Sequence, residues 1–195
     1  MDRRAFLGGL MGLAAVPVPA SALVSDGINP ALRARALAAF AAHRGQVKHA
    51  DVMGIVDYAK ASKLPRFHLL DLVSGKSETI LVAHGKGSDP AHSGWLERFS
   101  NRSGSNASSA GAFLTAEAYV GAHGRSMRLD GLEPSNDAAR ARAIVVHSAN
   151  YVTKDHPARH GKLGRSFGCF TVTADDLPMV MERLGAGRLL YSDKV

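Results

Sequence analysis

Two stretches decide how this chain is interpreted: Ala143-Ile144-Val145-Val146-His147-Ser148 and Gly164-Arg165-Ser166-Phe167-Gly168-Cys169-Phe170. The first is apolar and rich in β-branched residues, which predicts a buried strand that ends in a histidine. The second holds the only cysteine among the 195 residues. A thiol and a histidine at the end of a buried strand are the components of a cysteine nucleophile and its base. We therefore predict that Cys169 and His147 form a catalytic pair.

A cysteine acyl-transfer site needs more than this pair. A third group must hold the tautomer of the histidine, and Ser148 or a nearby backbone carbonyl can do so. Backbone N–H groups must face the developing oxyanion. The turn from Phe167 to Cys169, which follows Ser166, can aim such amides at one point, and Gly168 lets a substrate approach closely. Arg165 can hold a substrate carboxylate through a bidentate pair.

The N-terminus predicts export. Arg3-Arg4 precedes a short apolar run from Leu7 to Val16 and a small-residue cleavage site, Ala20-Ser21-Ala22. This pattern indicates a twin-arginine-type signal peptide over residues 1–22 and a mature protein in the periplasm or cell envelope. The apolar run is too short for a permanent membrane span, so we expect no stable membrane insertion after cleavage. An uncleaved N-terminal anchor is the alternative.

The rest of the chain fits one catalytic domain behind a helical segment. Residues 23–65 are expected to be helical. Asn29-Pro30 forms a helix start, the stretch from Ala31 to Phe40 has apolar residues at helical spacing, and a second helix is expected from Ala50 to Ser62. Residues 66–195 are expected to form the catalytic domain.

This second part carries mainly strand signals. Strands are expected over residues 66–72, 78–85, 112–115, 127–129, 143–147 and 188–192. A last helix is expected from Thr173 or Asp175 to Arg183. Because the stretch from Gly85 to Ala112 is rich in Gly, Ser and Asn, it predicts a long loop, and such loops in compact domains are often functional. The pattern predicts a β-rich α+β fold with flanking helices.

The composition favours a cell-wall partner over a nucleic acid. The formal net charge is +7, which suits an anionic polymer such as the cell wall. No run of basic residues interleaved with aromatic residues is present, so no nucleic-acid partner is expected. We also expect no cofactor.

The ordered set of motifs resembles the murein L,D-transpeptidase catalytic domain, the YkuD-type family of bacterial cell walls. That family has a histidine followed by Gly or Ser at a strand end and then a Ser-x-Gly-Cys stretch, which correspond here to His147-Ser148 and Ser166-Phe167-Gly168-Cys169. The resemblance covers roughly Phe67 to Tyr191 and implies a β-rich L,D-transpeptidase domain. Further similar stretches are Val82-Ala83-His84-Gly85-Lys86-Gly87-Ser88, Phe99-Ser100-Asn101, Ser108-Ser109-Ala110-Gly111, His123-Gly124 and Leu129-Asp130-Gly131-Leu132-Glu133-Pro134.

The resemblance implies a transferase that acts on peptidoglycan stem peptides. Cys169 would attack the carbonyl that joins the third residue of a stem tetrapeptide to its terminal D-Ala, and His147 would carry the proton to the leaving amine. An amine of a second stem would resolve the thioester as a 3→3 cross-link, whereas water would make the enzyme an L,D-carboxypeptidase. Most of the wider family has a histidine where Phe167 stands and an arginine shortly after the cysteine, where this chain has Phe170-Thr171.

Two other interpretations stay open on the sequence alone. We expect His84, His123 and Arg128 to line the cleft and no metal to be bound. His84, His92 and His123 can instead be ligands of a zinc-dependent peptidoglycan hydrolase, although no His-Glu-x-x-His pair is present. A non-catalytic wall-binding module would keep the fold and use Cys169 only as a buried packing residue.

Overall fold

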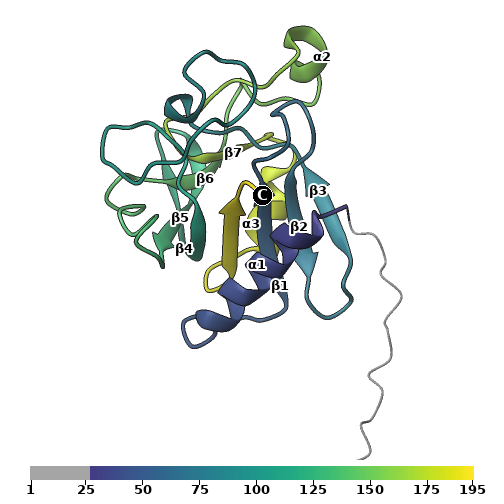
Figure 1. The fold of residues 1–195 in the computed structure, drawn as a ribbon, viewed down its shortest axis with the longest axis vertical. Helices are drawn as coiled ribbons and strands as arrows, with labels where there is room; N and C mark the ends of the chain where they lie inside the picture. The colour runs from purple at the N-terminus through teal and green to yellow at the C-terminus, as the bar shows by residue number, and fades with distance from the viewer. Residues whose placement is uncertain (1–26) are drawn as a thin grey trace, which may run out of the picture.

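The computed structural model describes residues 27–195. Within that range, one eight-stranded sheet has the strand order β3-β2-β1-β8-β4-β5-β6-β7 (Figure 1). The strands are β1 (Val52–Asp57), β2 (Phe67–Asp71), β3 (Ser77–Ile80), β4 (Gly111–Gly121), β5 (Gly124–Gly131), β6 (Val145–Ser148), β7 (Phe170–Val172) and β8 (Leu189–Asp193). The helices are α1 (Pro30–Ala42), α2 (His156–His160) and α3 (Leu177–Arg183), with a short 3-10 helix η1 (Lys86–Ser88). The signal peptide expected over residues 1–22 lies outside the described residues.

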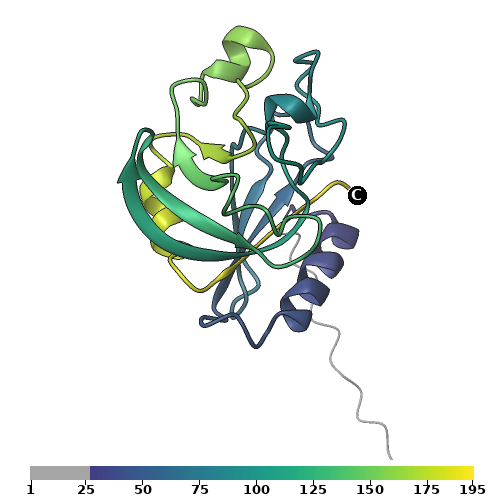
Figure 2. The same ribbon diagram turned by 90° about the vertical axis from the view of Figure 1, so that its left-hand side faces the viewer.

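The sheet curves until its two edges meet. β1 pairs in parallel with β8, and β6 pairs in parallel with β7, while the other neighbours are antiparallel. Ala83, shortly after β3, donates its N–H to the carbonyl of Thr171 in β7 at 2.9 Å. Because β3 and β7 are the two ends of the strand order, this bridge closes the sheet around its core. Figure 2 shows the long β4–β5 ribbon following the same curve.

Helices cover the two faces of this sheet. On the inner face, Phe67, Phe113 and Phe170 pack in one apolar cluster with residues of α3. On the outer face, Met53 and Ile55 of β1 pack in a second cluster with α1. Figure 2 shows α1 and α3 on opposite sides of the strands. The predicted β-rich α+β fold with flanking helices is confirmed.

The start of α1 follows from local chemistry. The side-chain oxygen of Asn29 accepts hydrogen bonds from the N–H groups of Ala31 at 2.9 Å and Leu32 at 3.3 Å. These N–H groups have no partner inside the helix, so the asparagine stabilises the helix end. Pro30 occupies the first turn, where its missing N–H costs nothing. The predicted helix start at Asn29-Pro30 is confirmed.

The second helix, expected from Ala50 to Ser62, is wrong, because β1 occupies this segment. All six residues of β1 are buried, so the segment lacks the alternation of apolar and polar residues that marks a half-buried strand. β1 lies between β2 and β8 and belongs to the same sheet as the strands after residue 66. At Gly54, a Cβ atom would lie 2.5 Å from Leu190 Cδ1, so the glycine permits this close strand packing.

Other elements differ in extent from the prediction. β4 and β5 are longer than expected because they continue into a two-stranded ribbon, and β7, α2 and η1 were not expected. α3 begins at Leu177, after a turn in which Thr173 Oγ1 accepts the N–H of Asp176 at 3.0 Å. None of the helices in residues 27–195 combines the length and hydrophobicity needed to cross a bilayer.

Candidate active site

The parallel pair β6–β7 brings the predicted nucleophile beside the predicted base. In its register, Val146 lies opposite Phe170 and His147 lies opposite Thr171. Val146 and Phe170 belong to the inner core. Because side chains alternate along a strand, His147 and Thr171 share the outer face of the sheet. Cys169 directly precedes β7. The thiol therefore belongs to the chain segment next to the strand that carries the imidazole.

The thiol of Cys169 is buried and protonated in its resting state. The residue is 8% exposed, and its sulfur donates a hydrogen bond to the carbonyl of Ala143 at 3.5 Å. Burial raises the pKa of the Cys169 thiol, against the opposing effects of the Val145 N–H and the Arg142 charge. A base must therefore remove the proton before this thiol can act as a nucleophile at neutral pH.

His147 is held as a neutral base. Its Nδ1 lies 2.9 Å from the backbone carbonyl oxygen of Ser148. A carbonyl only accepts hydrogen bonds, so Nδ1 carries the proton and Nε2 carries the lone pair. Burial lowers the pKa of His147, which favours the neutral imidazole. Ser148 thus orients the predicted base through its backbone carbonyl.

His123 stacks on this imidazole. It lies in the turn between β4 and β5, and its ring centroid is 4.4 Å from that of His147, with 22° between the ring planes. After burial, the nearness of His123 is a further influence that lowers the pKa of His147. Of the three predicted cleft residues, His123 is therefore placed directly against the predicted base.

Replacement of His123 should change the titration of His147. His123→Ala removes the ring that covers His147, so we expect the pKa of His147 to rise. If catalysis needs neutral His147, the acid limb of the pH–rate profile would then move to higher pH. His123→Phe keeps an aromatic cover and should give a smaller rise. Histidine NMR titration of the purified variants measures both, and an unchanged His147 titration in His123→Ala would contradict the stacking role.

The turn before Cys169 is held by Ser166 and requires a glycine. The Ser166 hydroxyl donates to the carbonyl of Cys169 at 2.8 Å and accepts the N–H of Gly168 at 3.1 Å. Gly168 has a φ of 118°, a conformation that glycine adopts readily. A Cβ atom at this position would lie 2.7 Å from the carbonyl oxygen of Ala107. Since the N–H of Gly168 is already bonded to Ser166, any oxyanion contact from it must compete with that hydroxyl.

Phe167 and Arg165 both contact the loop from Gly85 to Ala112. Phe167 is 63% exposed, and the ammonium of Lys86 lies 4.0 Å from the centroid of its ring. Nη1 of Arg165 donates to the carbonyls of Asp89 and, at 3.1 Å, of Pro90. A substrate carboxylate must therefore compete with two loop carbonyls for this nitrogen of Arg165.

Arg128 lies on the same face of the sheet as His147. In the β5–β6 register, Ser126 is opposite His147 and Arg128 is opposite Val145. The Arg128 guanidinium is engaged, since Nε lies 3.3 Å from a carboxylate oxygen of Glu117. It also packs 4.4 Å from the ring centroid of Tyr119. Arg128 is thus near the predicted base and already has an ionic partner.

Comparison with protein families places the chain. A family model described as the L,D-transpeptidase catalytic domain matches residues 25–192. The chain belongs to the L,D-transpeptidase catalytic domain family. The match includes every predicted site residue, and the resemblance inferred from the motifs is confirmed. A comparison with curated proteins found no match.

Solved L,D-transpeptidases are similar to this chain at low identity. An L,D-transpeptidase from Mycobacterium tuberculosis H37Rv is 13% identical, with a TM-score of 0.45, over 74% of this chain and 58% of that chain. One from Mycobacterium smegmatis is 14% identical, with a TM-score of 0.42, over 73% and 58%. L,D-transpeptidase 3 from Mycobacterium tuberculosis, in complex with a faropenem-derived adduct, is 13% identical, with a TM-score of 0.45, over 74% and 60%. This chain thus spans less than two thirds of their length.

In this L,D-transpeptidase domain, His84 belongs to a buried network. His84 is 1% exposed, and its Nδ1 accepts a hydrogen bond from Arg66 at 2.9 Å. Its Nε2 donates to the carboxylate of Asp89 at 3.1 Å. Burial, together with the Arg66 charge, lowers the pKa of His84 to about 4. The structure therefore places His84 inside the protein and not on a cleft wall.

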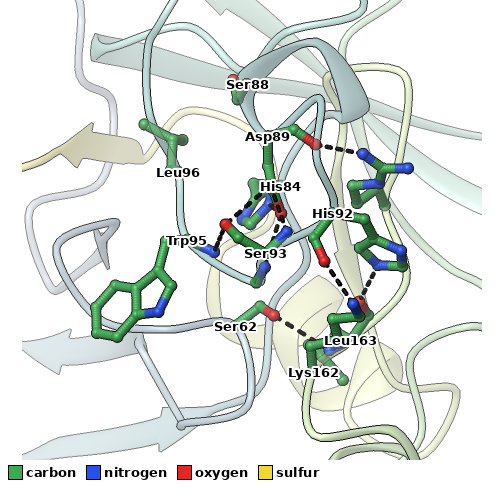
Figure 3. A network of polar contacts seen from close by, with 12 residues as sticks. Ser62, His84, Ser88, Asp89, His92, Ser93, Trp95, Leu96, Lys162 and Leu163 are labelled. Atoms are coloured by element: carbon green, nitrogen blue, oxygen red, sulfur yellow. Dashed lines mark hydrogen bonds and ion pairs between the residues drawn. The ribbon is translucent and has the colours of Figure 1, made fainter.

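Asp89 is the centre of this network, and sequence reasoning missed it. Its carboxylate also accepts the N–H groups of Ser93 at 2.7 Å and Gly94 at 2.9 Å. Figure 3 shows His84 and Ser93 converging on Asp89. Burial acts to raise the pKa of this carboxyl, but the hydrogen bonds outweigh it and the pKa is lowered. The loop from Gly85 to Ala112 is thereby anchored by a charged group.

The same loop is tied to the nucleophile motif. The Ser166 N–H donates to the carbonyl of His84 at 2.9 Å, and the Lys86 N–H donates to the carbonyl of Ser166 at 2.8 Å. On the other side of the motif, Arg142 donates to the carbonyl of Ser100 at 2.8 Å and to the Ser109 hydroxyl at 2.6 Å. Arg142 was also missed, because nothing in its local sequence marks it. The loop thus supports the turn that carries Cys169.

The described residues offer no cluster of metal ligands. In residues 27–195, no three His, Cys, Asp or Glu side chains are arranged to hold a metal ion. His84 lies in the buried network, whereas His123 stacks on His147 near the surface. Nε2 of His92 lies 3.0 Å from the carbonyl oxygen of Leu163. The three histidines considered as zinc ligands therefore lie in separate environments.

Proposed function

We propose that this chain is a peptidoglycan L,D-transpeptidase that uses Cys169 as its nucleophile and His147 as its base. One observation carries the proposal. His147 has Nδ1 bound to the Ser148 carbonyl and a lone pair on Nε2, and it lies on the strand that pairs with the segment after Cys169. An oriented neutral imidazole on the strand next to the cysteine supports acyl transfer, and both residues lie inside the region matched by the family model.

The proposed reaction proceeds through a thioester. His147 takes the thiol proton, and the sulfur attacks the carbonyl between the third residue of a stem tetrapeptide and its terminal D-Ala. The tetrahedral intermediate collapses with loss of D-Ala, whose amine takes the proton from His147. An amine of a second stem attacks the thioester, gives a proton to His147 and leaves with the acyl group as a 3→3 cross-link. The thiol of Cys169 is then restored.

The proposed substrate agrees with the chemistry and location expected from the chain. Stem peptides are attached to an anionic cell wall, and the formal net charge of +7 favours association with it. The twin-arginine-type N-terminus would place the enzyme in the periplasm or cell envelope, where these stems lie. The same thioester hydrolysed by water would make D-Ala release the end of the reaction, as in an L,D-carboxypeptidase.

Covalent capture by a carbapenem tests the proposal. In this family's chemistry, the β-lactam carbonyl takes the place of the acyl donor, so the thiolate opens the ring and gains the mass of one whole carbapenem molecule. We expect one adduct on the wild-type protein by intact-protein mass spectrometry and none on Cys169→Ala. Exposed Phe167 stands where most of the wider family has histidine, so we expect capture to be slower than in such members.

A control with iodoacetamide distinguishes an unreactive thiol from a pocket that does not bind an acyl donor. Iodoacetamide labels any accessible thiolate without needing an acyl-donor pocket. A wild-type protein that reacts with iodoacetamide but carries no carbapenem adduct after long exposure would rule out a pocket of this kind.

A further inference from the structure

A buried hydroxyl lies against the base on the side where it should receive the thiol proton. Thr171 of β7 is fully buried, and its Oγ1 lies 3.1 Å from Nε2 of His147. The phenol oxygen of Tyr151 lies 3.3 Å from the same Oγ1. The three side chains therefore form a chain of contacts that ends on the imidazole.

The direction of each hydrogen bond in this chain is determined. Nδ1 of His147 must donate, because its partner is the carbonyl oxygen of Ser148. Burial favours the neutral imidazole, and in that form Nε2 can then only accept. Thr171 must then donate its single hydroxyl hydrogen to Nε2. Since that hydrogen is used, Tyr151 must donate to Thr171. Protons thus point from Tyr151 through Thr171 toward His147.

This arrangement separates the nucleophile from the base. The lone pair of Nε2 is occupied by Thr171, while the thiol of Cys169 donates to the carbonyl of Ala143. A hydrogen bond to the neutral form of a base stabilises that form, so Thr171 resists protonation of His147. The thiol proton has no acceptor on the imidazole until the Thr171 hydroxyl turns away.

We propose that Thr171 is a positioning residue of the base, which holds His147 neutral and uncoupled from Cys169 in the substrate-free protein. Tyr151 supports it by donating to its oxygen. The proposal rests on the proposed function for the identity of the base. Binding of an acyl donor would have to turn the Thr171 hydroxyl before His147 can accept the thiol proton.

Other titratable groups face the pair, and among the ones named here only Tyr151 has a hydrogen bond to Thr171. His123 stacks on His147 from the β4–β5 turn. Arg142 acts on the Cys169 thiol from the segment before β6. Tyr58, after β1, and Tyr151 have their own pKa values raised mainly by burial, with a small contribution from Cys169. A change in the labelling rate of Cys169 is therefore assigned to the Thr171 hydroxyl if it appears in Thr171→Val, which lacks the hydroxyl, and not in Thr171→Ser, which keeps it.

The test compares Thr171→Val with Thr171→Ser. Valine keeps the shape and removes the hydroxyl, so Nε2 becomes free to accept the thiol proton. We expect Thr171→Val to react with iodoacetamide about tenfold faster than wild type at neutral pH, because its labelling midpoint moves about one unit lower. Thr171→Ser keeps the donor and should label at the wild-type rate. Tyr151→Phe should show a smaller increase, since Thr171 still donates to Nε2.

Two controls make the result specific. In a His147→Ala background, Thr171→Val should no longer change the labelling rate. In the wild-type protein, nitrogen-15 NMR of histidine should find His147 protonated on Nδ1, a measurement that needs no variant to fold. The proposal is overturned if Thr171→Val labels no faster than wild type, or if Thr171→Ser is accelerated as much as Thr171→Val. It is also overturned if NMR finds the His147 proton on Nε2.

The outcome is distinguishable from that of the proposed function. Thiol labelling needs no acyl donor, whereas carbapenem capture does. If Thr171→Val labels faster than Thr171→Ser but the wild type forms no carbapenem adduct, the role of Thr171 is retained and the transpeptidase site is rejected. If the wild type forms the adduct but the two variants label at the same rate, the transpeptidase site is retained and the role of Thr171 is rejected.

Discussion

Cys169→Ala is expected to abolish release of D-Ala from a stem tetrapeptide, while the protein stays folded. The chain contains a single cysteine, so no other thiol can replace it. Loss of a covalent nucleophile removes the whole acylation route, and we expect a decrease of about 10⁴-fold or more. Alanine is smaller than cysteine and adds no polar group to the buried site, so the fold should tolerate it. Mass spectrometry of the released D-Ala measures the rate.

The matched control is Ser103→Ala, an exposed position in the loop from Gly85 to Ala112, which should retain the wild-type rate. Turnover near wild type in purified Cys169→Ala would end the assignment of Cys169 as nucleophile. A chelator should leave the wild-type rate unchanged. Loss of activity that zinc restores would instead favour the metal-dependent hydrolase.

Arg66→Met is expected to lower the free energy of unfolding by about 3 kcal/mol. Arg66 is fully buried, and it donates to the carbonyl of Val82 at 2.9 and 3.0 Å and to the carbonyl of Lys60 at 2.8 Å. Burial lowers the pKa of Arg66 to about 10, so it still carries its charge at neutral pH. Methionine fills much of the space but leaves these carbonyls and Nδ1 of His84 without their donor. Urea denaturation measures the change.

The control for this prediction is Arg125→Met, an exposed arginine at the start of β5. Its change should lie within about 0.5 kcal/mol, as is usual for surface positions. An unfolding free energy of Arg66→Met equal to that of Arg125→Met would contradict a stabilising role for the buried network. Because a backbone hydrogen bond joins Ser166 to His84, we also expect Cys169 to be labelled faster by iodoacetamide in Arg66→Met.

Local chemistry made several parts of this protein readable from the sequence. The Asn29 cap of α1, the strand that ends at His147 and the turn before Cys169 each depend on residues that are close together along the chain. The ordered motifs also indicated the family that the family model then matched over residues 25–192. Ser148 was predicted as the orienting group because it adjoins the base, and its backbone carbonyl contacts Nδ1.

The missed features depend on neighbours that are distant in the sequence. β1 was taken for a helix, because an apolar cluster on each side of the sheet buries both faces of the strand and leaves no alternation along the segment. A search for polar side chains close to Cys169 in the sequence would have found Thr171, two residues later in β7. Its hydrogen bond to His147, however, follows from the register of β6 and β7.

The family, the fold class and the residue types available for cysteine chemistry follow from short motifs and local periodicity along the chain. The role of each histidine, in contrast, depends on packing between distant segments. His84 became a buried neutral partner of Arg66 and Asp89, while His123 came to lie against His147. The physical reason is that solvation and hydrogen-bond partners set the charge and orientation of an imidazole, and strand pairing between distant segments supplies both.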